Sequence, residues 1–232
     1  FKAERRLKNN FAFNVSYTLS SSMDDASSPG PTESETNFPQ NVNKLFSRDG
    51  EWAHSSFDHR HLFVASGVYE LPFFAKAGGF IGNVLGNWRL NTIITAQSGA
   101  PFTVNLGVDQ ANVGAGPAQR PDQLRDADLG GGQRTPDRWF DTAAFSLPEQ
   151  FTFGSARRNS VLGPGFANVD LAIAKTWSVT EPARLEFRWE IFNVTNRSNF
   201  DLPNRIFGNP NFGRIFSAKS PREMQFGLRL SF

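Results

Sequence analysis

The stretch from Glu223 to Phe232 restricts the fold of this chain more than any other. Apolar and polar residues alternate along it without a break. A repeat of two residues is the repeat of a β-strand, because the side chains of a helix repeat every 3.6 residues. The sequence therefore predicts a strand with one apolar and one polar face. The apolar positions are Met224, Phe226, Leu228, Leu230 and Phe232.

Similar alternation recurs along the chain and predicts six further strands. Between them lie stretches rich in Ser, Pro, Asn and Gly, which are typical of loops. Asn residues tolerate a positive φ, so Lys8 to Asn10 is expected to form a tight turn. Long loops are expected at 21–57, 107–166 and 194–221. The predicted strands lie near 1–7, 11–20, 61–72, 87–106, 168–177, 183–193 and 222–232.

One predicted strand has a face that carries a row of charges. Between 183 and 193, acids and bases alternate on the face opposite Leu185, Phe187 and Trp189. A water-filled or plugged barrel lumen accepts such a row, and so does a solvated sheet face, whereas a closed core rejects unpaired charge. We expect a structural ladder of ion pairs, with direct contact to a substrate as the alternative. The candidate lumen-facing residues are Arg184, Glu186, Arg188, Glu190 and Arg229.

The composition excludes several classes of protein. No run of about 18 apolar residues exists, which excludes a transmembrane helix, whereas strands of about 10 alternating residues allow a transmembrane barrel. The 24 Phe residues favour apolar surroundings although the mean hydropathy is −0.40. A net charge of +2 from scattered basic residues argues against a nucleic-acid partner. The absence of cysteine excludes disulfides and thiolate sites.

The lengths of the connections favour a barrel in the outer membrane. Short connections after residues 7 and 177 and long ones after 20, 106 and 193 fall on opposite sides, as periplasmic turns and extracellular loops do. Trp88 and Trp177 would then join an interfacial aromatic belt, and Lys175 would snorkel to the same interface. We predict an all-β fold, an antiparallel transmembrane β-barrel segment with long extracellular loops; a soluble β domain is the alternative. The positions expected to face outward are Phe13, Val15, Tyr17, Leu90, Leu171, Ile173, Phe187, Trp189, Phe226, Leu228 and Leu230.

Six stretches resemble one family of transporters. They are FDHRHLFVASGVYELPFF (57–74), GNWRLNTIITAQSGAPFTV (86–104), RTPDRWFDTAAF (134–145), GPGFANVDLAIAKTW (163–177), FRWEIFNVTNRSNFDLP (187–203) and PREMQFGLRLSF (221–232). Together they resemble the C-terminal barrel of the Oar-like TonB-dependent outer-membrane transporters, whose barrel follows a carboxypeptidase-regulatory-like domain and a plug.

The resemblance implies a fold and a function. The chain would supply the last six to seven strands of a barrel of about 22 strands in the cell outer membrane, with its signal and first domains upstream. It would take up an unidentified substrate by active transport, with outer-membrane lipid, a TonB-type energy-coupling complex acting through the plug, and the barrel-assembly machinery as partners. A passive porin or adhesin barrel, or a soluble β-rich binding domain, are the alternatives. The expected assembly signal comprises Phe226, Leu228, Leu230 and Phe232.

The sequence patterns that could indicate a metal-binding or catalytic site are weak. His54, Asp58, His59 and His61 could bind a divalent ion, but they fall within a stretch that matches the family. Acids at Asp122, Asp126 and Asp128 lack the spacing and closing glutamate of an EF-hand loop. No nucleophile elbow of the G-x-S-x-G kind is present. We therefore expect no catalytic, cofactor or metal site, and no enzymatic activity.

Overall fold

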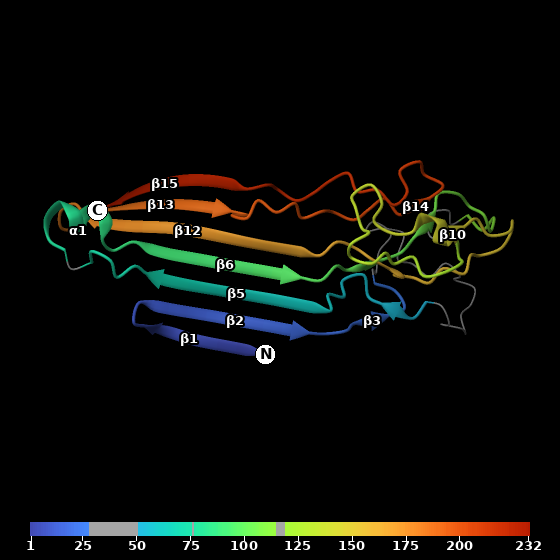
Figure 1. The fold of residues 1–232 in the computed structure, drawn as a ribbon, viewed down its shortest axis with the longest axis horizontal. Coiled ribbons are helices and arrows are strands. Elements are labelled where there is room, and N and C mark those ends of the chain that lie inside the picture. The colour runs from blue at the N-terminus through green and yellow to red at the C-terminus, as the bar shows by residue number, and fades with distance from the viewer. Residues whose placement is uncertain (28–50, 76, 115–118) are drawn as a thin grey trace.

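Seven strands lie side by side in one antiparallel sheet (Figure 1). The computed structural model describes residues 1–27, 51–75, 77–114 and 119–232. Each strand of the sheet pairs with the next one along the chain. Within the described residues, the first and last strands have a neighbour on one side only, so the sheet is open. In order, the strands are β1 (Lys2–Lys8), β2 (Phe11–Leu19), β5 (His61–Glu70), β6 (Arg89–Gln97), β12 (Phe166–Ser178), β13 (Arg184–Phe192) and β15 (Glu223–Ser231).

The pairing register keeps the two kinds of side chain on opposite faces. Trp189 of β13 lies opposite Ile173 of β12 and Phe226 of β15. On the other face, Glu186 lies opposite Thr176 and Arg229. Because side chains directly opposite each other share a face, the alternation along each strand adds up to one apolar face and one polar face across the sheet. In β1 the register shifts between Arg5 and Lys8.

The two ends of the sheet carry different connections. All three long connections lie at one end (Figure 1). The other end holds the turn after β1, the turn after β12 and the connection from β5 to β6, which contains the short helix α1 (Gly79–Leu85). None of the helices in the described part of the chain is long and apolar enough to cross a membrane.

The long connections fold together into a compact assembly, here called the cap. It comprises the described residues of 20–60, 98–165 and 193–222. Residues 28–50 and 115–118, which fall in two of the predicted loops, lie outside the described residues. Eight short strands and a 3-10 turn brace the cap: β3 (Met23–Asp24), β4 (Ala53–His54), β7 (Pro101–Phe102), β8 (Asn105–Leu106), β9 (Asp122–Gln123), η3 (Thr142–Ala144), β10 (Phe145–Ser146), β11 (Val161–Leu162) and β14 (Ile206–Phe207).

A hydrophobic core lies inside the cap rather than against the sheet. Phe102, Val104, Phe140 and Phe145 are nearly inaccessible to solvent, and the rings of Phe140 and Phe212 meet edge to face at 5.0 Å. Strand β8 pairs in parallel with β14, which joins the second long connection to the third. The loops that the sequence marks only as aperiodic therefore hold a packed core.

One predicted strand is shorter than expected. The prediction extended from 87 to 106, but β6 ends at Gln97, and 101–106 turn into the cap as β7 and β8. The break lies at Gly99, where a Cβ atom would come within 1.9 Å of the carbonyl oxygen of Gly163. Only glycine allows the two backbones to approach this closely, so the second connection crosses the end of the strand here.

Candidate functional site on the charged face of the sheet

An arginine between two glutamates forms the centre of the charged row. Arg188 of β13 contacts Glu186 at 3.2 Å and Glu190 at 3.4 Å. All three leave the same face, two residues apart, so one guanidinium bridges both carboxylates. About half of the Arg188 side chain remains exposed, which leaves it able to contact water, a plug or a solute.

The row continues onto β15. Gln225 donates to the carboxylate of Glu190, while Arg229 lies directly opposite Glu186 and Arg184 opposite Ser231. The register therefore brings all of the predicted lumen-facing residues onto one face and onto two neighbouring strands. Those residues are Arg184, Glu186, Arg188, Glu190 and Arg229.

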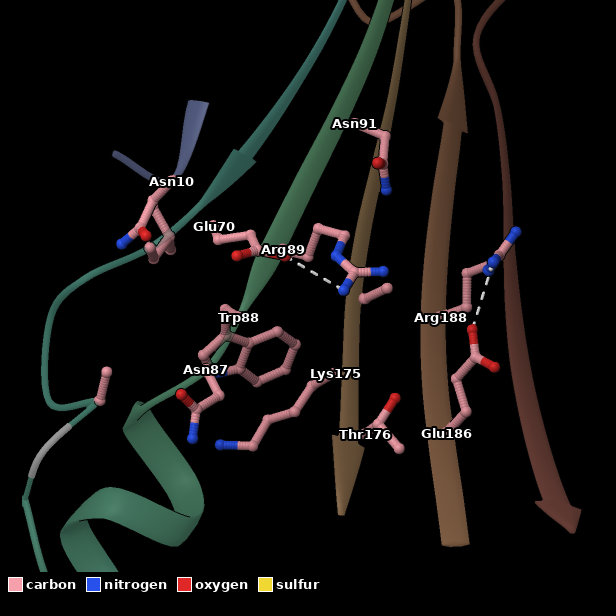
Figure 2. A pocket seen from close by; sticks show the side chains of 13 residues that line it. Asn10, Glu70, Asn87, Trp88, Arg89, Asn91, Lys175, Thr176, Glu186 and Arg188 are labelled. Carbon is pink, nitrogen blue, oxygen red and sulfur yellow. Dashed lines mark hydrogen bonds and ion pairs between the residues drawn. The ribbon is translucent and has the colours of Figure 1, made fainter. Parts of the chain in front are cut away.

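A polar recess of about 430 Å³ lies beside this row, at the end of the sheet that carries α1 (Figure 2). Arg89 and Glu70 pair on one side of it at 3.2 Å. Arg188 and Glu186 line its far side. Ions of both signs border the recess, so it can hold polar or charged groups of either sign through fixed hydrogen-bond donors and acceptors.

The opposite face of the sheet is apolar. Every position expected to face outward lies on it, as the pairs Phe13 with Gly67, Leu90 with Ile173, and Phe187 with Leu228 illustrate. Two basic residues are exceptions, because Lys175 shares this face with Phe187 and Arg5 shares it with Phe13. The side chain of Lys175, which was expected to snorkel to the interface, is only 3% exposed and donates to the carbonyl oxygen of Gly86, just after α1.

Two buried arginines hold the cap together. Arg158 contacts the Asp24 carboxylate and donates to Ser27 Oγ at 2.8 Å and to the Glu51 carbonyl oxygen at 3.1 Å. Arg120 pairs with the Glu51 carboxylate. Sequence reasoning missed both arginines, because nothing in an aperiodic stretch distinguishes a buried cation from a solvated one.

Burial and pairing shift the pKa values of this network. Desolvation raises the pKa of Asp24, but hydrogen bonds from Ser55, Arg158 and Ser27 outweigh it and hold the pKa below its usual value. Desolvation lowers the pKa of Arg120, and the charge of Glu51 opposes that shift. Since the carboxylate of Asp24 stays ionised, the pair with Arg158 is an ion pair at neutral pH.

The histidines considered as metal ligands have separate partners. His54 Nδ1 lies 2.8 Å from an Asp58 carboxylate oxygen, while Nδ1 of His59 lies 2.8 Å from the carbonyl oxygen of Ser98. His61 Nδ1 lies 2.8 Å from the hydroxyl of Tyr17. These contacts join β2, β5 and the cap.

The acidic residues considered as calcium ligands also serve the loops. Asp122 accepts from the backbone of Ser155 at 2.8 Å, and Asp126 accepts from the backbone of Asp128 at 2.9 Å. Asp128 pairs with Arg134. A search of the described residues finds no group of three or more His, Cys, Asp or Glu side chains placed to hold a metal ion.

The residues expected to form the assembly signal are exposed. β15 pairs with β13 on one side, and its other edge has no partner among the described residues. The edge therefore presents free backbone donors and acceptors, which are a template for pairing. The exposed fractions are 69% for Phe226, 72% for Leu228, 58% for Leu230 and 93% for Phe232.

Comparison with known families decides the class of this sheet. The model of the outer membrane beta barrel domain family matches residues 1–225. The chain belongs to this family. No curated protein and no solved structure matches it.

Membership places the barrel in the cell outer membrane. In such barrels, one side of each strand meets lipid and the other meets the lumen. The face with Phe187, Trp189 and Phe226 can contact hydrocarbon at low cost, whereas the row around Arg188 cannot. We therefore infer that the apolar face contacts lipid and the charged face lines the lumen.

Proposed function

We propose that this outer-membrane barrel belongs to a TonB-dependent active transporter of the Oar-like kind. Substrate would enter through the cap, and a plug inside the lumen would be moved by an energy-coupling complex in the inner membrane. The charged row would contact the plug. The proposal assigns no catalytic step to the chain.

The observation that carries the proposal is the packed cap over one end of a charged face. The second and third connections share one core around Phe102 and Phe140. Arg158 of the second connection pairs with Asp24 and so ties the first connection to them. An ordered assembly of this kind can recognise a large substrate, because its binding groups are held in place before the substrate arrives. The family-like stretches at 86–104 and 134–145 belong to this part of the chain or enter it.

A second partner is proposed for the edge of β15. Its free backbone groups and exposed apolar side chains fit β-augmentation by the barrel-assembly machinery. Within a finished barrel, the same edge would pair with another strand, since unpaired backbone groups are not tolerated in lipid.

Conductance of the full-length protein in a planar lipid bilayer tests the proposal. A transporter with its plug in place is expected to pass almost no current until mild denaturant loosens the plug. A passive porin would conduct as soon as it inserts, and that result would overturn the proposal. The second expected result is cross-linking of the full-length protein to the periplasmic domain of the energy-coupling protein. The yield of this cross-link should rise when an extract that contains the transported substrate is added.

A further inference from the structure

Helix α1 exposes its apolar side chains and buries Gly82. Phe80 is 80% exposed, Ile81 53% and Leu85 49%, and Val84 belongs to the same stripe. Residues three and four positions apart share one side of a helix, so positions 80, 81, 84 and 85 form one stripe. A helix on a water-soluble surface turns such a stripe toward the protein, so α1 has the opposite orientation.

The orientation of α1 is fixed by close backbone contacts on its inner side. A Cβ atom on Gly82 would lie 1.8 Å from the carbonyl oxygen of Ala77, and one on Gly86 would lie 2.6 Å from that of Phe74. The helix is therefore seated on its own preceding loop through Gly82, its one buried residue. It cannot roll its apolar stripe inward without losing this fit.

Three donors from the sheet hold the C-terminal end of α1. Trp88 Nε1 donates to the carbonyl oxygen of Val84 at 3.0 Å, and Trp177 Nε1 donates to that of Asn83 at 2.7 Å. Lys175 donates to Gly86, and its ammonium lies 5.5 Å and 5.4 Å from the centres of the two indole rings. The last carbonyls of a helix lack partners within it and carry partial negative charge, so a cation here is stabilising.

All three donors leave the lipid-facing side of the sheet. Lys175 and Trp177 lie opposite Phe187 and Leu185 in the register, and the ring of Trp88 meets that of Phe187 at 6.0 Å. Figure 2 shows Lys175 extending from β12 toward α1, away from Thr176 on the same strand. Helix α1, with its exposed stripe, is thus attached to the side of the sheet that we infer to contact lipid.

We propose that α1 is a membrane-interface anchor that lies in the phospholipid leaflet at the end of the barrel with the short connections. Its apolar stripe, with Phe73 and Phe74 of the preceding loop, occupies the boundary between headgroups and acyl chains. Amphipathic helices and tryptophans both favour this zone. Lys175 is buried beneath the helix, and its hydrogen bond to Gly86 fixes the position of α1 relative to the sheet. The inference is independent of whether the barrel transports actively or passively.

Depth measurement with a spin label tests the anchor. This chain contains no cysteine, so Ile81→Cys in the full-length protein provides a single labelling site within it. We expect a nitroxide at this position, in phospholipid vesicles, to collide far more often with oxygen than with a polar nickel reagent. A matched label at Leu124, which is 65% exposed in the cap, is expected to show the reverse.

A second variant tests the role of Lys175. Lys175→Met keeps the length of the side chain but removes the donor to Gly86 and the cation between the indoles. The oxygen preference at position 81 is expected to fall several-fold in this background, provided that a heat-shift gel shows the barrel to be folded. An unchanged preference would overturn the role of Lys175.

Two results with the folded wild-type background would overturn the anchor itself. Equal access of the nickel reagent to labels at 81 and 124 would mean that α1 lies in water. Exclusion of both reagents at 81 would mean that protein, either a partner or a second copy, covers the helix.

Discussion

The sheet and the cap are stabilised by different forces. Among the described residues, the buried apolar side chains lie in the cap, with Ala174 and Ile191 of the sheet as the exceptions. The strands of the sheet instead leave most side chains partly exposed on both faces. The cap therefore folds as a water-soluble protein does, by burying its own apolar surface, whereas the sheet depends on backbone hydrogen bonds and on lipid.

Because of this difference, the same residue type contributes differently to the stability of the two regions. Arg158 is fully buried in the cap and holds three partners, whereas Arg188 on the sheet is half exposed beside two glutamates. Replacing each arginine with the same residue separates the two regions directly. The predictions below run from the largest expected effect to the smallest.

Arg158→Met is expected to destabilise the cap by about 3 kcal/mol, since it leaves the Asp24 carboxylate without its buried cation. Protease treatment of intact outer membranes should then cut the cap, while a heat-shift gel still shows a folded barrel. Arg157→Met is the matched control, because Arg157 is the exposed neighbour. Loss of the barrel along with the cap would show that the two regions do not fold separately.

Ile173→Arg is expected to cost about 2 to 4 kcal/mol, because Ile173 lies on the lipid-facing side near the middle of β12. Ala172→Arg places the same side chain one residue away, on the lumen side, and should cost much less. Folding into lipid vesicles, followed in denaturant, measures both. Reversed costs would mean that the register is shifted by one residue, which exchanges the two faces.

The cap is expected to lose stability in acid before the sheet does. Hydrogen bonds from Arg125 hold the pKa of Asp141 below its usual value, and those from Lys219 lower the pKa of Asp201. A carboxyl with a lowered folded-state pKa stabilises the fold above its unfolded pKa, and this stabilisation is lost as the pH falls through the folded value.

Protease resistance of the cap should therefore be constant at neutral pH and decline below about pH 4. Asp141→Asn removes the carboxylate that pairs with Arg125 and Arg138. It should lower resistance at neutral pH and flatten the acid dependence. A decline that begins near pH 6 would contradict the role given to these carboxylates.

Arg188→Met is expected to cost less than about 1 kcal/mol, because exposed ion pairs contribute little in water. Denaturant unfolding of the full-length barrel measures this loss. A much larger loss would show that the proposed contact between the charged row and the plug excludes water from these ion pairs. The same substitution at Arg158 is the comparison.

The all-β class was predictable from alternation, and the outer-membrane location from alternation together with the lengths of the connections. Along β13 and β15, the position of each residue predicts the face on which its side chain lies, because a strand repeats every two positions. Lipid and lumen impose opposite polarities on the two faces, so the pattern at Arg184–Phe192 is strong.

The cap was not predictable in the same way. Its core residues, such as Phe102 and Phe140, come from irregular backbone with no repeat, and the partners of Arg158 are distant in the chain. Helix α1 was missed because two glycines within seven residues resemble a flexible connection. The spacing of Phe80, Ile81, Val84 and Leu85 was the available indication of a helical stripe.

The contacts inside the cap have a consequence for the alignment of the strands. A slip of two residues between neighbouring strands keeps every side chain on its own face, so alternation alone does not oppose it. Such a slip moves one strand by about 7 Å along its neighbour, which would separate Arg158 from Asp24 and β8 from β14. The loop contacts thus fix the position of each strand along its neighbour, which alternation alone leaves open. An intact cap therefore indicates that neighbouring strands are paired in the correct register.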